Sequence, residues 1–258
     1  MEFSGTIATL GSGVTRFQVG DEVFGSTLLK FGTHAEYVCM PADGLIEKRP
    51  ANMPLDECAA VLFGGLTVLG FLGKAKINPR DKVLVYGASG SVGVFAVQIA
   101  KHYGAHVTAV CSQANAEMVK SLGADEAIDY TKEDFSKAGR VYDMIFDTVG
   151  KAGLGRSLKS LKRGGYYLVV SGVGRKTMLG DVFVGTIVQI WGRITGAVKL
   201  IGMPKQGGLA NVIFLKELIE AGKVRTVIER RYRLEDISAA HRHAEGGHKK
   251  GHVLITFD

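Results

Sequence analysis

The stretch that decides the fold is Lys82-Val83-Leu84-Val85-Tyr86-Gly87-Ala88-Ser89-Gly90-Ser91-Val92-Gly93. Its first half is a short apolar run of strand-forming residues, and a glycine-rich turn follows at once. Residues 92–103 then carry apolar side chains at helical spacing. The stretch therefore predicts a strand, a tight turn and a helix.

Within the turn, Ala88-x-Gly90-x-x-Gly93 is a variant of the glycine fingerprint of dinucleotide-binding folds, with alanine in place of the first glycine. A glycine at 90 lets the backbone approach a pyrophosphate, and a glycine at 93 lets the helix pack close to the strand. The helix N-terminus offers unpaired N–H groups and a partial positive charge to phosphates. We predict that a cofactor pyrophosphate binds at Ala88, Ser89, Gly90, Ser91, Val92 and Gly93. A purely structural turn is the alternative.

A second strand, predicted at residues 106–111, ends near the position where NAD-binding proteins place a carboxylate for the ribose. This chain has Ser112 there, and its first carboxylate afterwards is Glu117. Without a carboxylate there is no repulsion against a 2′-phosphate, so NADP(H) is favoured over NAD(H). Asn115 is only a weak phosphate ligand, and neither Arg nor Lys directly follows Ser112.

Composition points to a packed protein with one large domain or two small ones. The chain has 258 residues, of which 46% are hydrophobic and 22% charged, with a formal net charge of +7. A basic protein could bind nucleic acid, but no basic run here exceeds two residues. We therefore expect an enzyme that holds a polyanionic cofactor and does not bind nucleic acid.

The cysteines are odd in number and scattered along the chain, at Cys39, Cys58 and Cys111. This argues against a disulfide framework and for a reducing compartment. The N-terminal residues lack the basic and apolar regions of a signal peptide, so we expect a cytoplasmic location.

The most apolar region runs from residue 182 to residue 201, and Arg193 and Lys199 interrupt it. Its longest uncharged part is shorter than the ~20 residues of a membrane span. We expect a buried or interface-facing helix, with a role at a membrane surface as the less favoured alternative.

The first fifty residues are rich in turns and strand-like segments at 2–10, 21–24 and 33–40, and residues 53–77 turn helical, with a break at Gly64-Gly65. Strands and helices then alternate, the strands at 126–130, 142–148, 166–171 and 252–257 and the helices at 116–122, 154–161, 212–221 and 234–245. This alternation predicts an α/β fold with a doubly wound parallel sheet and ligands at the carboxyl ends of its strands.

The chain resembles the medium-chain dehydrogenase/reductase superfamily, in particular its zinc-free branch of quinone oxidoreductases and enone reductases. The matching segments occur in family order at 11–25, 87–93, 121–125, 128–130, 146–150 and 251–255. The resemblance implies a Rossmann NADP(H)-binding domain at 53–223. It also implies a partial GroES-like catalytic domain at 1–52, and the C-terminal segment 224–258 returns to this domain after the Rossmann domain.

In this family the motif around Phe3-Ser4-Gly5 lies well inside the catalytic domain, whereas here Met1 stands just before it. The resemblance thus implies that the N-terminal part of the GroES-like domain is missing, in a natural short form or a fragment. That part usually contributes one wall of the nicotinamide cleft. An NADPH-binding pseudoenzyme, acting as a sensor or interaction protein, is the alternative to an active enzyme.

The resemblance also implies further cofactor contacts. Thr67 would face the nicotinamide end, or simply cap a helix, and Tyr130 would flank the adenine or its ribose, or simply end a strand. Ser171-Gly172 follows a predicted strand at the edge where cofactors bind. Lys249 or Lys250, of which we select Lys250, could reach the 2′-phosphate, although a solvated lysine pair is the alternative. No catalytic residue or proton donor is assigned.

We predict no metal site. The four-cysteine lobe of the zinc-dependent branch is absent, and the three cysteines do not have the spacing of a closed zinc site. The histidines of the tail are expected in a solvated turn, namely His241, His243, His248 and His252. The implied activity is metal-free, NADPH-dependent hydride transfer to a quinone or an α,β-unsaturated carbonyl compound, by a homodimer.

Overall fold

The computed structural model describes residues 1–137, 139–170, 196, 198–202, 207–247 and 249–257. The chain divides into two compact units, Met1–Leu66 with Gln206–Asp258, and Thr67–Lys205. These borders differ from the predicted ones because residues 53–66 and 207–223 group with the first unit. One reason is that the Asn52 side chain donates to the carbonyl oxygen of Ile219 (2.9 Å).

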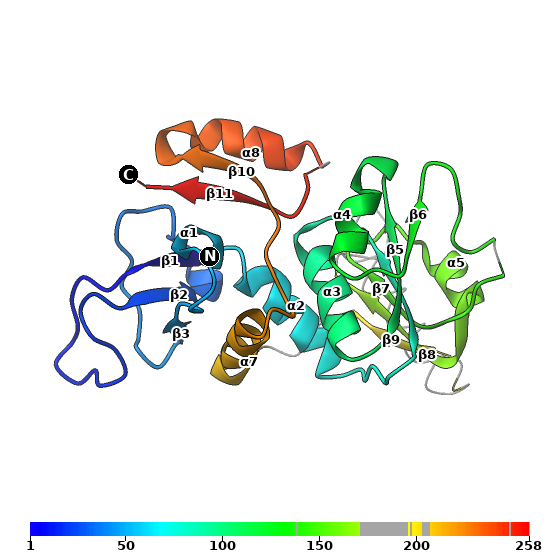
Figure 1. Ribbon diagram of the computed structural model, residues 1–258, viewed down its shortest axis with the longest axis horizontal. Helices are drawn as coiled ribbons and strands as arrows, with labels where there is room; N and C mark the ends of the chain where they lie inside the picture. The colour runs from blue at the N-terminus through cyan, green and yellow to red at the C-terminus, as the bar shows by residue number, and fades with distance from the viewer. Residues whose placement is uncertain (138, 171–195, 197, 203–206, 248, 258) are drawn as a thin grey trace. The chain divides into compact units, whose positions relative to one another are not determined.

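The second unit contains a parallel sheet whose strand order is β6-β5-β4-β7-β8-β9. Its strands are β4 (Lys82–Tyr86), β5 (His106–Cys111), β6 (Glu126–Asp129), β7 (Tyr142–Asp147), β8 (Leu161–Val169) and β9 (Val198–Ile201). In Figure 1 the helices α3 (Ser91–His102) and α4 (Ala116–Ser121) lie on one side of this sheet and α5 (Leu154–Lys159) on the other. The predicted doubly wound sheet is confirmed. The strand order reverses between β4 and β7, where ligands bind in such folds.

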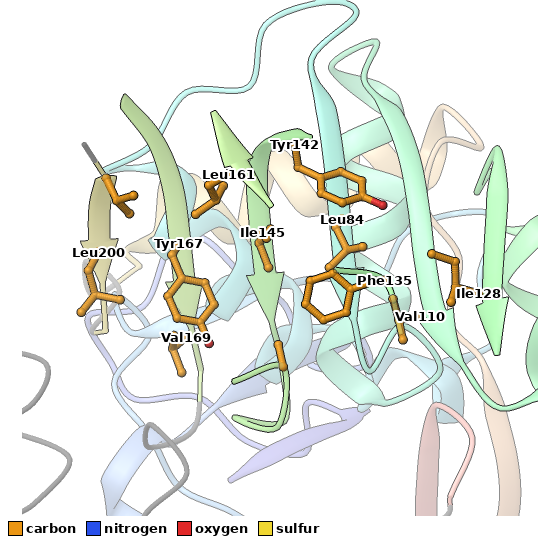
Figure 2. Close-up of a cluster of buried hydrophobic side chains, with 12 residues drawn as sticks. Leu84, Val110, Ile128, Phe135, Tyr142, Ile145, Leu161, Tyr167, Val169 and Leu200 are labelled. Atoms are coloured by element: carbon orange, nitrogen blue, oxygen red, sulfur yellow. The ribbon is translucent and has the colours of Figure 1, made fainter. Parts of the chain in front are cut away.

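Both faces of the sheet are buried, as expected for parallel strands. One face carries the cluster of Figure 2, in which Leu84, Ile145 and Tyr167 lie on neighbouring strands and Leu154 of α5 packs against them. On the opposite face, Phe71 meets Phe146 edge-on at 5.3 Å between ring centroids. Burying each such side chain contributes roughly 1.5–3 kcal/mol to the stability of the fold. The core therefore holds the carboxyl ends of the strands in fixed positions.

Helix α3 connects β4 to β5 and is buried along most of its length. It begins after Gly90, which is extended, and ends at Tyr103. Gly104 follows with φ +79°, a conformation that glycine adopts without strain, and its N–H closes the helix on the carbonyl oxygen of Lys101.

The first unit has a three-stranded antiparallel sheet of β1 (Glu2–Thr6), β2 (Glu22–Ser26) and β3 (Leu45–Lys48), and a parallel pair of β10 (Ile228–Arg233) and β11 (His252–Thr256). Its helices and 3-10 segments are η1 (Leu28–Lys30), α1 (Leu55–Cys58), α7 (Leu209–Glu220), η3 (Leu234–Asp236) and α8 (Ile237–Glu245). The antiparallel N-terminal sheet agrees with the predicted GroES-like part. The strand predicted at 33–40 is wrong: this segment pairs with no strand, and Tyr37 within it is exposed.

Helix α2 (Leu62–Leu72) runs through Gly64 and Gly65, so the break predicted there is also wrong. A Cβ atom on Gly65 would lie 2.6 Å from the Leu215 side chain, so this glycine serves close packing. The stretch Leu55–Leu72 has a mean hydropathy of 1.7 and is long enough to cross a membrane, but 56% of it is buried in the fold. Its composition fits a core segment of a folded protein.

Candidate cofactor site

The glycine-rich turn leaves β4 at a position that only glycine fits. Gly87 has φ +80°, and a Cβ atom there would lie 2.6 Å from the hydroxyl oxygen of Thr148. The N–H groups of Gly87 and Ala88 both donate to the carbonyl oxygen of Val110, at 3.0 and 3.1 Å. The turn is therefore fixed to β5 as well as to β4.

The two later glycines of the fingerprint have different physical reasons. A Cβ atom on Gly93 would overlap the carbonyl oxygen of Gly87 and lie 2.7 Å from the Cα of Ala88, so glycine is required by packing. Gly90 is extended (φ −82°, ψ 174°), and among the described residues a Cβ there would come within 4 Å of only the Gly87 carbonyl oxygen, at 3.5 Å. Neither backbone conformation nor packing requires glycine at 90. The free space above Gly90 is what the pyrophosphate of a dinucleotide would need.

Helix α3 begins directly behind this space. The Val94 N–H donates to the Gly90 carbonyl oxygen (3.0 Å), and the N–H groups before it lie in the first turn of the helix. The first turn contains no acidic residue. These donors and the helix dipole suit a phosphate, so the residues present fit a dinucleotide cofactor.

Thr148 links the two strands at which the sheet order reverses. Its hydroxyl lies 2.9 Å from the Tyr86 carbonyl oxygen and 3.1 Å from that of Gly87, and its N–H donates to Tyr86 (3.0 Å). The sequence analysis placed this threonine in a family segment without a role. Its position directly after a buried strand was the signal that could have identified it.

Asp147 is fully buried and shapes the loop after β7. Its carboxylate accepts the N–H groups of Val149, Gly150 and Ala152 at 3.2, 2.8 and 2.9 Å, and the hydroxyl of Tyr167 at 3.1 Å. Burial raises the pKa of Tyr167, so its hydroxyl stays protonated and donates. These four hydrogen bonds compensate the burial of the Asp147 carboxylate, and they hold the loop after β7 in place beside turn 87–93.

Ser112 and Tyr130 lie next to each other at the carboxyl ends of β5 and β6. The Tyr130 N–H donates to the Cys111 carbonyl oxygen (3.2 Å), and the Tyr130 ring is 49% exposed. Ser112 begins the 3-10 segment η2 (Gln113–Asn115), and its hydroxyl oxygen accepts a hydrogen bond from the Asn115 amide (3.2 Å). Since β4 and β5 are neighbours, turn 87–93, Ser112 and Tyr130 share one edge of the sheet.

A carboxylate that the sequence analysis did not consider lies one strand away from Ser112. Asp129 is paired in register with Cys111. One oxygen of its carboxylate accepts the N–H and hydroxyl of Thr131, at 3.0 and 2.8 Å. These hydrogen bonds lower the pKa of Asp129, so its carboxylate is ionised, and one of its oxygens already accepts from Thr131.

Two cysteines are buried, and burial raises the pKa of Cys58 to about 12 and of Cys111 to about 11. Cys111 is the last residue of β5, directly before Ser112. Neither thiol is ionised near neutral pH, so neither is a nucleophile.

The other predicted cofactor contacts, Thr67, Ser171, Gly172 and Lys250, stay predictions. Thr67 is half-buried in α2, and Ser171 and Gly172 lie outside the described residues. Lys250 belongs to the first unit, so its contact with the 2′-phosphate stays a prediction. Its neighbour Lys249 donates to the Gly251 carbonyl oxygen (2.7 Å), and burial lowers the Lys249 pKa.

Within the described part of the chain, no three histidine, cysteine or acidic side chains come together as a metal site. His243 pairs with Glu229 (2.8 Å). The expected solvated turn is wrong for His241 and His243, which lie in helix α8. It is also wrong for His252, which lies in β11 and is only 7% exposed, while His248 lies outside the described residues. Sequence spacing could not show that this histidine faces inward.

Comparisons with known proteins agree with this fold. The family described as the alcohol dehydrogenase GroES-like domain matches residues 1–50, and the family described as zinc-binding dehydrogenase matches residues 122–255. The mouse mitochondrial NAD(P)H oxidoreductase RTN4IP1 is 32% identical, over 99% of this chain and 69% of the relative. The tomato 2-methylene-furan-3-one reductase is 32% identical, over 98% of this chain and 62% of its own length.

A solved structure shows the same fold. The quinone oxidoreductase from Coxiella burnetii matches with a TM-score of 0.86 and 30% identity, covering 100% of this chain and 78% of that one. The expectation of a cytoplasmic location is overturned, because relatives from five animals are named mitochondrial and an Arabidopsis thaliana relative is a chloroplast envelope quinone oxidoreductase homolog.

Proposed function

Because this chain belongs to the medium-chain dehydrogenase/reductase superfamily, we propose that it is an NADPH-dependent oxidoreductase that reduces quinones or α,β-unsaturated carbonyl compounds. The observation that carries this proposal is the free space at Gly90, in front of the N-terminus of α3 and at the reversal of strand order. The relatives named above are oxidoreductases or reductases, which supports the proposed class of reaction.

Each element of the site has a task in this proposal. The N–H groups at the start of α3 bind the pyrophosphate, and the missing side chain at Gly90 leaves room for it. The exposed ring of Tyr130 flanks the adenine or its ribose. Thr148 and Asp147 keep the turn and the loop after β7 in place. A reduced nicotinamide cofactor supplies the hydride when it is bound.

The choice of NADPH over NADH is supported by the charges at the end of β5. Ser112 occupies the position of the usual ribose-binding carboxylate, and the nearby Asp129 is occupied by Thr131. NAD-binding proteins place a carboxylate at this position, where it binds both ribose hydroxyls. In this chain the neutral hydroxyl of Ser112 stands there instead, and it does not repel a 2′-phosphate.

The substrate class is supported by what the relatives are named to reduce. They include a quinone oxidoreductase, a furanone reductase and an NADPH-dependent alkenal/one oxidoreductase from Arabidopsis thaliana. The proposed transfer uses no metal, and the side chains described here contain no set of three metal ligands. We assign no proton donor.

A homodimer is the proposed assembly, formed by pairing of sheet edges across a two-fold axis. In the described part of the sheet, β9 is such an edge strand. Light scattering after size exclusion tests this, and a mass of one chain at micromolar concentration would contradict it.

The function is tested by titrating the protein with NADPH and NADH, followed by nucleotide fluorescence, and then by assaying NADPH oxidation with a panel of quinones and enones. We expect saturable NADPH binding and substrate-dependent oxidation. NADPH binding without oxidation of any substrate would favour the alternative, a cofactor-binding pseudoenzyme. Binding of neither nucleotide at millimolar concentration would contradict both.

A further inference from the structure

Asn115 stands at the start of α4 but does not do what asparagine usually does there. An asparagine before a helix normally caps it, with its side-chain oxygen accepting a backbone N–H of the first turn. The Asn115 side chain makes no such bond. Its Nδ2 instead donates back to the Ser112 hydroxyl oxygen (3.2 Å), while its backbone N–H donates to the Ser112 carbonyl oxygen (2.9 Å).

Fold stability does not explain this side chain. Asn115 is 6% exposed, and its buried Oδ1 has no hydrogen-bond partner among the described residues. A buried amide oxygen without a partner destabilises a protein, and an apolar side chain of similar size would avoid that cost. Among the described residues, the hydrogen bond that the Asn115 amide makes is the one to the Ser112 hydroxyl.

That contact decides what the serine can offer a ligand. A serine hydroxyl has one hydrogen to donate and two lone pairs to accept with. Because the Asn115 amide occupies a lone pair of the Ser112 oxygen, the hydroxyl hydrogen remains available for another acceptor. Ser112 is half-buried at the same sheet edge as turn 87–93.

We infer that Asn115 is a positioning residue that fixes Ser112 as a hydrogen-bond donor to the 2′-phosphate of NADPH, and so sets the preference for NADPH over NADH. The inference rests on the proposed NADPH-dependent function. A phosphate oxygen only accepts hydrogen bonds, so it needs a donor, whereas the 2′-hydroxyl of NADH can donate to a serine as well as accept from it. A serine whose hydroxyl is held as a donor therefore strengthens the binding of NADPH more than the binding of NADH.

The test is a double-mutant cycle read as the ratio of NADH to NADPH dissociation constants, measured by nucleotide fluorescence. The variants are Asn115→Leu, Ser112→Ala and the two combined, with Gln113→Ala as the control because Gln113 is an exposed neighbour in the same segment. We expect each single variant to lower the ratio about tenfold, because NADPH loses a charge-assisted hydrogen bond, whereas NADH loses at most a weaker neutral one. The double variant should match Ser112→Ala alone.

The outcomes separate this inference from the proposed function. If wild type prefers NADPH and Asn115→Leu keeps that preference, the positioning role is overturned while the function stands. Additive losses in the double variant also overturn it, because a merely structural role would add to the loss of Ser112. If wild type itself does not prefer NADPH, the cofactor choice fails on the wild-type protein alone, and the positioning role fails with it.

Asn115→Asp covers the case in which Asn115→Leu does not fold. The aspartate keeps the size of the side chain, but its carboxylate accepts the Ser112 hydroxyl hydrogen and adds a negative charge near the 2′-phosphate. We expect a larger fall of the ratio than for Ser112→Ala. An Asn115→Asp variant that retains the wild-type preference would overturn the inference.

Discussion

The hydroxyl of Thr148 lies 2.9 Å from the carbonyl oxygen of Tyr86 and joins the end of β7 to the end of β4. These two strands are neighbours at the point where the order of the sheet reverses, which is where a ligand crevice forms. The same hydroxyl lies 3.1 Å from the carbonyl oxygen of Gly87, the first residue of the glycine-rich turn. The placement of the proposed pyrophosphate site thus depends on a side chain from the next strand.

Thr148→Val should loosen this link, because valine keeps the shape of threonine but cannot donate a hydrogen bond. We expect the free energy of unfolding to fall by about 1 kcal/mol and the NADPH dissociation constant to rise several-fold. Urea unfolding and nucleotide fluorescence measure the two effects. Thr148→Ser retains the hydroxyl and should bind NADPH nearly as well as wild type; equal losses in both variants would contradict the role of the bond.

Gly90→Ala should separate binding from folding. Among the described residues, the added Cβ meets no atom closer than 3.5 Å, so the free energy of unfolding should change by less than about 1 kcal/mol. Alanine caps a helix less well than glycine, and this loss offsets the entropy that alanine gains over glycine. In the pyrophosphate space the same methyl group is an obstruction, and we expect NADPH binding to weaken about tenfold or more. Unchanged NADPH binding would contradict the proposal that the pyrophosphate binds at this turn.

Gly93→Ala is the counterpart of that variant in the same turn. Its Cβ overlaps the carbonyl oxygen of Gly87, a backbone atom that cannot rotate away. We expect a loss of about 3 kcal/mol or more in the free energy of unfolding, visible as a lower midpoint in urea. A Gly93→Ala protein as stable as Gly90→Ala would show that α3 does not pack against β4 as described.

Asp147→Asn should destabilise the loop after β7. One carboxylate oxygen accepts the N–H groups of Val149 and Gly150, and the other accepts the Ala152 N–H and the Tyr167 hydroxyl. In asparagine one of these oxygens becomes an NH₂ group, which cannot accept, so two of the four donors lose their partner. We expect the free energy of unfolding to fall by about 3 kcal/mol. Hydrogen exchange should show faster exchange at Val149, Gly150 and Ala152, and slow exchange at all three in the variant would contradict this assignment.

His252 should make the stability of the protein sensitive to acid. Burial lowers its pKa to about 4 from an ordinary 6.5, so the folded state disfavours the imidazolium form that the unfolded chain readily adopts. Its contribution is therefore fully present above pH 6.5 and is lost as the pH falls toward 4, by up to about 3 kcal/mol.

Urea unfolding between pH 7 and pH 4.5 measures this effect in wild type and in His252→Gln. We expect a smaller slope with pH in the variant than in wild type. The exposed His106 supplies a matched control variant, His106→Gln. Identical slopes in all three proteins would mean that His252 is not buried in its neutral form.

The sequence predicted the parallel sheet and the turn because these depend on local patterns. Residues 83–86 and 144–146 are apolar runs typical of strands buried on both faces, and Gly90 and Gly93 have a fixed spacing from β4. Features that depend on partners were missed. Residues 33–40 look like a strand but have no neighbour to pair with, and Gly65 looks like a helix breaker but accommodates Leu215.

The site was predicted unevenly for the same reason. Turn 88–93, Ser112 and Tyr130 follow predicted strands, so their shared edge could be anticipated from strand order. Thr148 and Asp147 were missed because their roles lie in contacts to Tyr86 and Tyr167, which are distant in sequence. The hydrogen bond from Asn115 could not be foreseen either, since an asparagine at a helix start normally predicts a cap.

The burial of Cys111 and Cys58 has a consequence for the proposed reduction of enones. Such compounds are electrophiles that alkylate thiolates, and a cysteine with a pKa of about 11 is ionised in only roughly one molecule in ten thousand at pH 7. Both thiols are also shielded from solvent. The strand that ends beside the cofactor is thereby protected from covalent damage by the compounds the protein is proposed to reduce.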